Sequence, residues 1–124
     1  MATYDDFNSQ PVRQIWEGIQ GRVITGERMT MALVDLEPNV ELAQHHHENE
    51  QMGFIIQGQM TFTIGGETRT LGPGDTYSIK SDTPHHGSTG PEGCVVIDVF
   101  APVRSDWEKL ERSEARPSSW RMDR

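Results

Sequence analysis

The segment QMTFTIGGETRTL, residues 59–71, restricts the fold of this chain more than any other feature. Two threonine-rich stretches alternate apolar and polar side chains on either side of Gly65-Gly66, a two-residue loop that tolerates the positive φ angles of a tight hairpin. Further short strands are expected at residues 22–26, 29–37, 40–44, 52–58, 76–81 and 94–100. Many short antiparallel strands without a βαβ rhythm predict an all-β fold, a small sandwich or barrel.

The C-terminal part of the chain departs from this strand pattern. Residues 105–115, SDWEKLERSEA, predict a short helix with Ser105 or Asp106 as its N-cap and Glu108 placed for a capping box. Residues 116–124 show no periodicity and are expected to form a tail. A chain of 124 residues, 34% of them hydrophobic, has enough apolar surface for one core, so residues 1–124 are expected to form a single domain.

Charge and cysteine content restrict the partners and the compartment. The formal net charge of −8 argues against nucleic acid as a partner, and no run approaches 18 consecutive apolar residues, so no membrane span is expected. The N-terminal segment MATYDDFNSQ lacks the layout of a secretory signal, and a lone cysteine, Cys94, cannot form an intramolecular disulfide. These features favour a cytoplasmic setting, with Cys94 as a small buried hydrophobe.

The edge strands of the expected sheet suggest that the protein forms an oligomer. The edge strands of a small sandwich need a cover, so we expect a homodimer that uses the N-terminal strands. Three tryptophans lie outside the strongest motifs, and we expect them to serve as core or dimer contacts rather than as platforms for a sugar: Trp16, Trp107 and Trp120.

Residues 45–51, HHHENEQ, raise the question of a metal site. A strand sends alternate side chains to opposite faces, so His45 and His47 point the same way and His46 points the other way. Two imidazoles on one face can bind one metal ion from a barrel wall. A polar loop with solvated histidines is the alternative, and the histidine run alone does not decide between the two.

The order of HHHENEQMGFIIQG, the turn GPGD and the segment TPHH resembles the two sequence motifs of the cupin family. His45 and His47 fill the two histidines of the first motif. Counting back six residues from its closing Gly58 reaches Gln51, where the family motif has Glu. His85, directly after a proline, fills the histidine of the second motif. The resemblance covers roughly residues 22–103 and implies a jelly-roll barrel, the cupin double-stranded β-helix.

The resemblance implies that one divalent transition metal ion is held by His45, His47, Gln51 and His85. Glu50 is a rival to Gln51, because acidic ligands bind divalent cations better than amides, although strand alternation puts Glu50 on the other face. Three imidazoles and an amide leave the full +2 charge on the metal and fit Ni, Zn, Fe, Mn or Co. Solvent-facing or bystander positions are expected for His46, Glu48, Asn49, Glu50 and His86.

Period-two alternation in CVVIDVF, residues 94–100, places Asp98 in an otherwise apolar strand. A buried carboxylate without a partner costs several kcal/mol, so Asp98 is expected to have a partner, a raised pKa, or both. Arg104, a short way past the strand, is the expected partner. A structural ion pair, or an aspartate on a solvated face, is the alternative to a functional role.

The segments GERMTMALVDLEP and VIDVFAPVRSDW, together with the first motif, resemble the small cupins that act on unsaturated monouronates in pectin and alginate breakdown. Asp98, Phe100 and Arg104 fill the Asp-x-Phe and following Arg of that subgroup. The resemblance implies conversion of a cyclic 4,5-unsaturated monouronate, a small carbohydrate acid, to its linear 4-deoxy-5-keto form. Arg104 would then bind the carboxylate, Asp98 would carry the proton, and Phe100 would pack against the sugar. A metal-dependent cupin dioxygenase and a non-catalytic sugar- or acid-binding cupin are the two alternatives.

Overall fold

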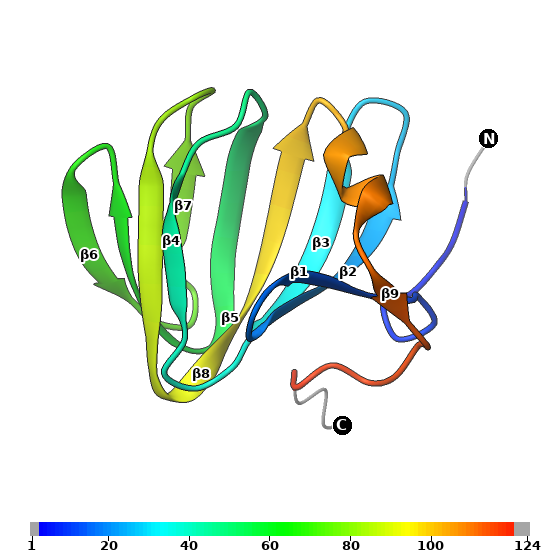
Figure 1. Cartoon of the computed structure of the whole chain (residues 1–124), viewed down its shortest axis with the longest axis horizontal. Helices are drawn as coiled ribbons and strands as arrows, with labels where there is room; N and C mark the ends of the chain where they lie inside the picture. The colour runs from blue at the N-terminus through cyan, green and yellow to red at the C-terminus, as the bar shows by residue number, and fades with distance from the viewer. Residues whose placement is uncertain (1–2, 121–124) are drawn as a thin grey trace.

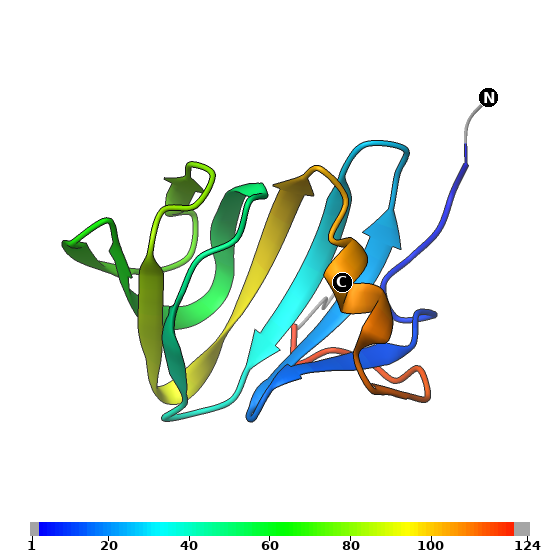
Figure 2. The same ribbon diagram turned by 45° about the horizontal axis from the view of Figure 1, so that its top comes forward.

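The computed structural model describes residues 3–120, which form an antiparallel β-sheet rolled into a jelly roll with one short helix (Figures 1 and 2). The all-β expectation is confirmed. The strands and the 3₁₀ helix are β1 (Val12–Trp16), β2 (Ile19–Thr25), β3 (Thr30–Leu36), β4 (Glu41–His45), β5 (Glu50–Ile64), β6 (Glu67–Leu71), β7 (Thr76–Ile79), β8 (His85–Ala101), η1 (Ser105–Lys109) and β9 (Arg112–Ser113).

Two long strands, β5 and β8, build both halves of the roll. They pair along almost their whole length, with β3, β2, β1 and β9 following β8 on one side and β6 following β5 on the other. Figure 1 shows β8 bending at the bottom of the view on its way from β4 to β3. Gly58 was expected to close its strand, but β5 continues through it, because a shift of register between Gly58 and Met60 lets the strand bend.

The hairpin predicted at residues 59–71 is confirmed. Gly65 and Gly66 join β5 to β6 with φ angles of 54° and 85°, the positive values that the two-residue loop demands. Across the outer face, the hydroxyl oxygens of Thr61 and Thr70 lie 3.2 Å apart, and those of Thr63 and Thr68 lie 2.7 Å apart. The threonines therefore hydrogen-bond to each other on a polar surface.

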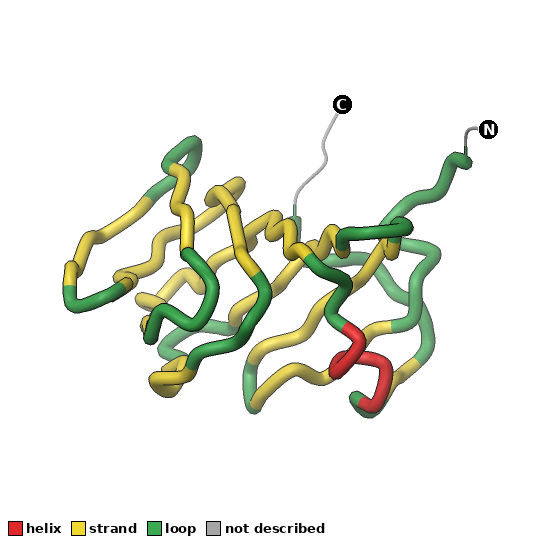
Figure 3. The backbone as a smooth tube through the Cα atoms, turned by 90° about the horizontal axis from the view of Figure 1, so that it is seen from above, coloured by secondary structure: helices red, strands yellow, loops and turns green. Residues whose placement is uncertain are grey.

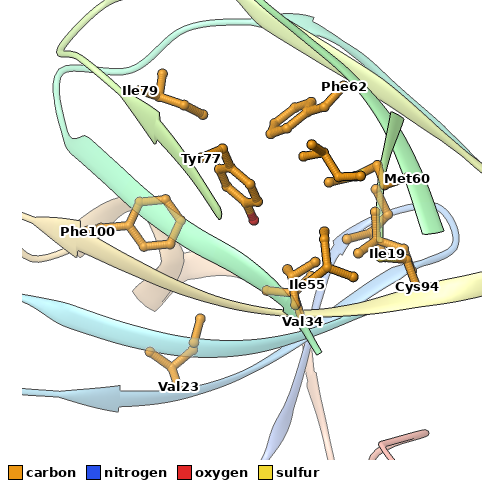
Figure 4. Close-up of a cluster of buried hydrophobic side chains, with 14 of the residues drawn as sticks. Ile19, Val23, Val34, Ile55, Met60, Phe62, Tyr77, Ile79, Cys94 and Phe100 are labelled. Atoms are coloured by element: carbon orange, nitrogen blue, oxygen red, sulfur yellow. The ribbon is translucent and has the colours of Figure 1, made fainter. Parts of the chain in front are cut away.

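The inward side chains of both halves meet in one hydrophobic core (Figure 4). Ile55 and Ile79 are completely buried, and the rings of Phe62 and Tyr77 meet edge to face with centroids 5.0 Å apart. Cys94 is buried in the same cluster, as expected, and burial raises the pKa of its thiol to about 12. Several of these core residues, among them Phe62 and Tyr77, also line the pocket described below.

The helix predicted over residues 105–115 is much shorter than expected. It is a 3₁₀ turn that ends at Lys109, and the chain then forms β9, which pairs with β1. No side chain caps the turn, because the Asp106 carboxylate binds Arg104 instead and Glu108 binds Arg112. Burial of Trp107 and the pairing of β9 override the local helical pattern. Figure 3 shows this helix as the one red segment, among yellow strands.

The beginning of the expected tail, residues 116–120, docks on the outer face of β2 and β3, and we call it the C-terminal strap. The buried guanidinium of Arg22 donates hydrogen bonds to the backbone carbonyls of Arg116 and Pro117, at 2.8–3.0 Å. Asp35 accepts from Ser118 and from the backbone of Ser119, and pairs with Arg22 at 2.6 Å. Residues 121–124 of the expected tail lie outside the described part of the chain.

Candidate metal centre and pocket

Strand pairing brings three histidines together. His45 at the end of β4 is the register partner of His85 at the start of β8, and their ring centroids are 4.1 Å apart. His47 follows in the loop after β4, with its ring 4.9 Å from that of His85. One ligating nitrogen from each of the three lies within 4.8 Å of the others. The histidines predicted from the sequence therefore converge on one point.

Hydrogen bonds fix the tautomer of each ring so that Nε2 is the unprotonated nitrogen in all three. The Nδ1–H groups donate at 2.8–2.9 Å to backbone carbonyls two residues away, from His45 to Ala43, from His47 to Asn49 and from His85 to Thr83. The Nε2 lone pairs then face one another. That of His85 is buried and has no hydrogen-bond partner among the described residues. An unpaired buried acceptor of this kind is what a bound cation would satisfy.

The protonation state also suits a metal. Burial, as the largest effect, lowers the pKa of all three imidazoles, and for His85 to about 4. The rings are therefore neutral at neutral pH, the form that coordinates metal ions. Three neutral imidazoles suit a transition-metal ion, and none of them has to lose a proton before it can bind one.

Gln51 lies against the histidine cluster, whereas Glu50 faces away from it. The Gln51 Oε1 atom lies 3.1 Å from His47 Nε2, and its side chain also hydrogen-bonds to Asp98. With Nδ1 of His47 donating to the backbone, its Nε2 and the amide oxygen are two acceptors facing each other, a contact that a cation between them would relieve. Glu50 is exposed on the opposite face of β5.

The connecting residues divide into solvated and buried ones. His46 is exposed beside Asp82, and Glu48 and His86 are exposed too, as expected. The expectation that Asn49 faces solvent is wrong. Its side chain is buried and donates to the carbonyl of Pro102 at 2.6 Å, which ties the histidine loop to the segment after β8.

Asp98 is buried, but its partner is not the one expected. The Tyr77 hydroxyl donates to Asp98 Oδ1 at 2.5 Å, whereas Arg104 acts on Asp98 only through its longer-range charge. Burial raises the pKa of Asp98 to about 6 against the opposing effect of these hydrogen bonds. Gly53 pairs with both Tyr77 and Asp98 across neighbouring strands, and a Cβ there would collide with both side chains. Sequence reasoning missed Tyr77, and only the register of β7 against β5 reveals it.

Arg104 is fixed at the wall of the same cavity by three neighbours. Its guanidinium carbon lies 4.7 Å from the ring centre of Phe100 and 4.3 Å from that of Trp107. Asp106 binds it through two hydrogen bonds, at 3.0 and 2.9 Å. Phe100 is almost fully buried beneath this stack and supports the guanidinium.

The pocket that these groups share has a volume of about 350 Å³. Its polar lining includes His45, His47, Gln51, His85, Asp98 and Arg104. Two of the tryptophans line it as well: Trp107 from the core, as expected, and Trp16, whose ring meets that of His45 edge-on at 4.7 Å. The cavity therefore combines three neutral imidazoles, the buried carboxyl group of Asp98 and the stacked guanidinium of Arg104.

A family model described as "Cupin domain" matches residues 32–100. The chain belongs to the cupin family. The pectin degradation protein KdgF of Dickeya dadantii (strain 3937) is 28% identical over 109 residues, covering 86% of this chain and 99% of that protein. The solved structure of KdgF from Halomonas sp. superimposes with a TM-score of 0.78 at 25% identity, covering 86% of this chain and 98% of the other.

Another similar protein carries a different name. The acireductone dioxygenase of Bacillus velezensis is 25% identical over 96 residues, covering 68% of this chain and 54% of that protein. The relatives of this cupin thus include one protein named for pectin degradation and one named as a dioxygenase. Among residues 3–120, no helix is long and apolar enough to cross a membrane.

Proposed function

We propose that this cupin is a metal-dependent isomerase that converts cyclic 4,5-unsaturated monouronates to linear 4-deoxy-5-keto uronates. One observation carries the proposal: the three-histidine cluster shares a single cavity with the Tyr77–Asp98 pair and the stacked guanidinium of Arg104. The similarity to a pectin degradation protein over almost the whole chain supports it. A cavity of about 350 Å³ suits one sugar acid.

Each group in the cavity has a task in this reaction. Arg104 binds the substrate carboxylate with the guanidinium edge that Asp106 leaves free. Asp98 accepts the proton of the C1 hydroxyl group and delivers it to C4. The bond between C1 and the ring oxygen breaks, leaving an aldehyde at C1 and a ketone at C5, and no atom is gained or lost. Tyr77 holds the Asp98 carboxyl in place through its hydroxyl group.

Four neutral donors, His45, His47, His85 and the amide oxygen of Gln51, hold the metal in this proposal. A bound divalent ion supplies a local positive field that polarises substrate oxygens, undiminished by any ligand charge. Phe100 and Trp107 exclude water from one wall and keep Arg104 from swinging away. Gln51 links the two parts, because its side chain contacts both His47 and Asp98.

The test is the loss of ultraviolet absorbance from the C4=C5 bond of an unsaturated monouronate. Absorbance that falls with purified protein, stops after chelation and returns with a divalent metal supports the proposal. An Asp98→Asn variant that binds metal but turns over at full rate contradicts the role given to Asp98. Unchanged absorbance with metal bound rules out the proposed uronate isomerase activity.

A dioxygenase is the second candidate, favoured by the three-histidine cluster together with the dioxygenase relative. This chemistry consumes oxygen and does not require the Asp98–Arg104 arrangement. An oxygen electrode with the iron-loaded protein separates the two enzymes. A binding-only cupin would bind the sugar acid and form no product in either assay.

A further inference from the structure

Two of the groups proposed to act in the pocket lie outside the strands. Gln51 and Phe100 are register partners, and the pairing of β5 with β8 ends one residue before Gln51 and one residue after Phe100. His47 precedes this pairing, in residues 46–49, which we call the histidine loop. Arg104 follows it, in residues 102–104, which we call the arginine segment. The sheet register therefore does not fix His47 and Arg104 relative to each other, although Figure 1 shows both segments at the top of the roll.

The side chain of Asn49 joins the two segments. It is buried, and its amide nitrogen donates to the carbonyl of Pro102 at 2.6 Å and to that of Val103 at 3.4 Å. A proline has no N–H group, so the backbone of the arginine segment cannot donate the next hydrogen bond of the ladder at that position. The carboxamide of Asn49 therefore continues the connection between the two segments where the backbone pairing stops.

The backbone of Asn49 also contacts a proposed metal ligand. Its carbonyl accepts the Nδ1–H group of His47 at 2.9 Å, the hydrogen bond that leaves the Nε2 atom of His47 unprotonated. Asn49 is not among the described residues that line the pocket, so it can influence a bound substrate only through its neighbours. One buried residue thus orients His47 through its backbone and holds the arginine segment through its side chain.

Thr30 holds the same arginine segment from the opposite side. The backbone N–H group of Arg104 donates to the hydroxyl oxygen of Thr30 at 3.0 Å, and Thr30 is fully buried on β3. The carbonyl of Arg104 accepts from the backbone N–H group of Trp107 at 3.0 Å. Because β8 lies between β3 and β5 in the sheet, Thr30 is separated by a strand from the histidine loop. Thr30 therefore offers a comparison residue that supports Arg104 without contacting His47.

We propose that Asn49 is a positioning residue that couples the metal cluster to Arg104. The inference rests on the proposed function, in which one substrate must meet the metal and the guanidinium at the same time. Reacting groups have to be held in place to within a fraction of an ångström, and a misplacement of about 1 Å can cost about 100-fold in rate. Asn49 sets the separation of His47 and Arg104 because each of them is one hydrogen-bonded step away from it.

Three variants separate positioning from general stability. Asn49→Ala removes the bridge between the two segments. Thr30→Val keeps almost the same shape and removes only the hydroxyl group that anchors the backbone of Arg104. Thr89→Val is the matched control, because the buried Thr89 hydroxyl also joins two backbone groups, the N–H of Val40 and the carbonyl of Glu37, and lies outside the described lining of the pocket.

The first measurement is zinc affinity, by competition with a chromogenic chelator. Asn49→Ala is expected to bind zinc about 10-fold more weakly or worse, because His47 loses the support of its hydrogen-bond acceptor, while Thr30→Val and Thr89→Val stay within about twofold of the wild type. Wild-type zinc affinity in Asn49→Ala overturns the proposal. An equal loss of affinity in Thr89→Val also overturns it, because loss of stability alone would then explain the effect.

The second measurement is turnover of the unsaturated monouronate by the metal-saturated variants. Asn49→Ala and Thr30→Val are expected to raise KM about 10-fold and to keep kcat within about threefold of the wild type, since Arg104 binds the substrate carboxylate and Asp98 carries the proton. Thr89→Val is expected to match the wild type. A wild-type KM in Asn49→Ala restricts that residue to supporting His47 and overturns the coupling.

The third measurement follows Arg104 without any turnover. The Nε–H group of Arg104 donates to Asp106, so its NMR signal reports the position of the guanidinium. The signal is expected to shift in Asn49→Ala and in Thr30→Val and to remain in place in Thr89→Val, and an unmoved signal in Asn49→Ala refutes the coupling. A wild type without isomerase activity would end the proposed function alone, because zinc affinity and this signal still decide the role of Asn49.

Discussion

Replacing Asp98 by asparagine is expected to stabilise the metal-free protein above about pH 6, although it removes the proposed proton carrier. Burial raises the pKa of Asp98 from its ordinary 3.8 to about 6, so the folded state favours the protonated form. In the unfolded chain the carboxyl ionises near pH 4, and between these two values folding binds a proton. The wild type therefore loses stability as the pH rises through this interval. This pKa shift corresponds to a loss of about 3 kcal/mol in the free energy of unfolding of the wild type, and the asparagine variant does not undergo that loss.

The assay is thermal unfolding of the chelated wild type and Asp98→Asn proteins at pH values from 4 to 8. Near pH 4 the two should melt within about 2 °C of each other, because Asp98 is then protonated and equally neutral. Above pH 6 the variant should melt about 5–10 °C higher, at roughly 4 °C per kcal/mol and with part of the gain offset by altered hydrogen bonds to Tyr77. A constant difference across the whole pH range would refute the claim that the buried charge destabilises the fold.

Three further measurements probe the cluster and the strap. His85→Ala should abolish stoichiometric metal binding, measured by elemental analysis after dialysis, whereas His86→Ala, on the outer face, should bind one metal per chain as the wild type does. Asp35→Ala leaves the buried Arg22 with an unpaired charge and should lower the free energy of unfolding by about 3–5 kcal/mol in urea titrations, while loss of the exposed pair between Glu67 and Arg69 should cost less than about 1 kcal/mol. Adding metal to 100 times its dissociation constant should stabilise the folded chain by about 2.7 kcal/mol, and a melting temperature that does not respond to metal would contradict a preformed site.

Local patterns in the sequence predict the parts of this fold that neighbouring residues determine. The Gly65–Gly66 hairpin follows from turn chemistry. His45 and His47 converge as predicted, but strand alternation is not the reason, because β4 ends at His45 and His47 lies in the loop that follows. The helix expected over residues 105–115 fails for a complementary reason. The burial of Trp107 and the pairing of β9 with β1 outweigh the local helical pattern. Because β1 lies about 100 residues earlier in the chain, the sequence around residues 105–115 does not predict that pairing.

The partners of the site residues depend on contacts between distant segments. Tyr77 meets Asp98 because β7 and β8 both pair with β5 at Gly53, and no spacing within either segment encodes that meeting. Arg104 was expected to bind Asp98, but its nearest carboxylate is Asp106, two residues along the chain. A strand pattern identifies which residues face inward, and only the sheet register decides which of them touch.

The position of Gln51 offers a physical reason for an amide where the cupin motif has a carboxylate. Its side chain contacts His47 and also hydrogen-bonds to Asp98. A glutamate there would set two buried carboxylates against each other, and one of them would have to remain protonated. The amide serves both neighbours instead, because its oxygen faces the histidine cluster while its N–H group can donate to Asp98. The amide at position 51 therefore keeps the proposed donor set neutral and at the same time avoids a second carboxylate beside the buried Asp98.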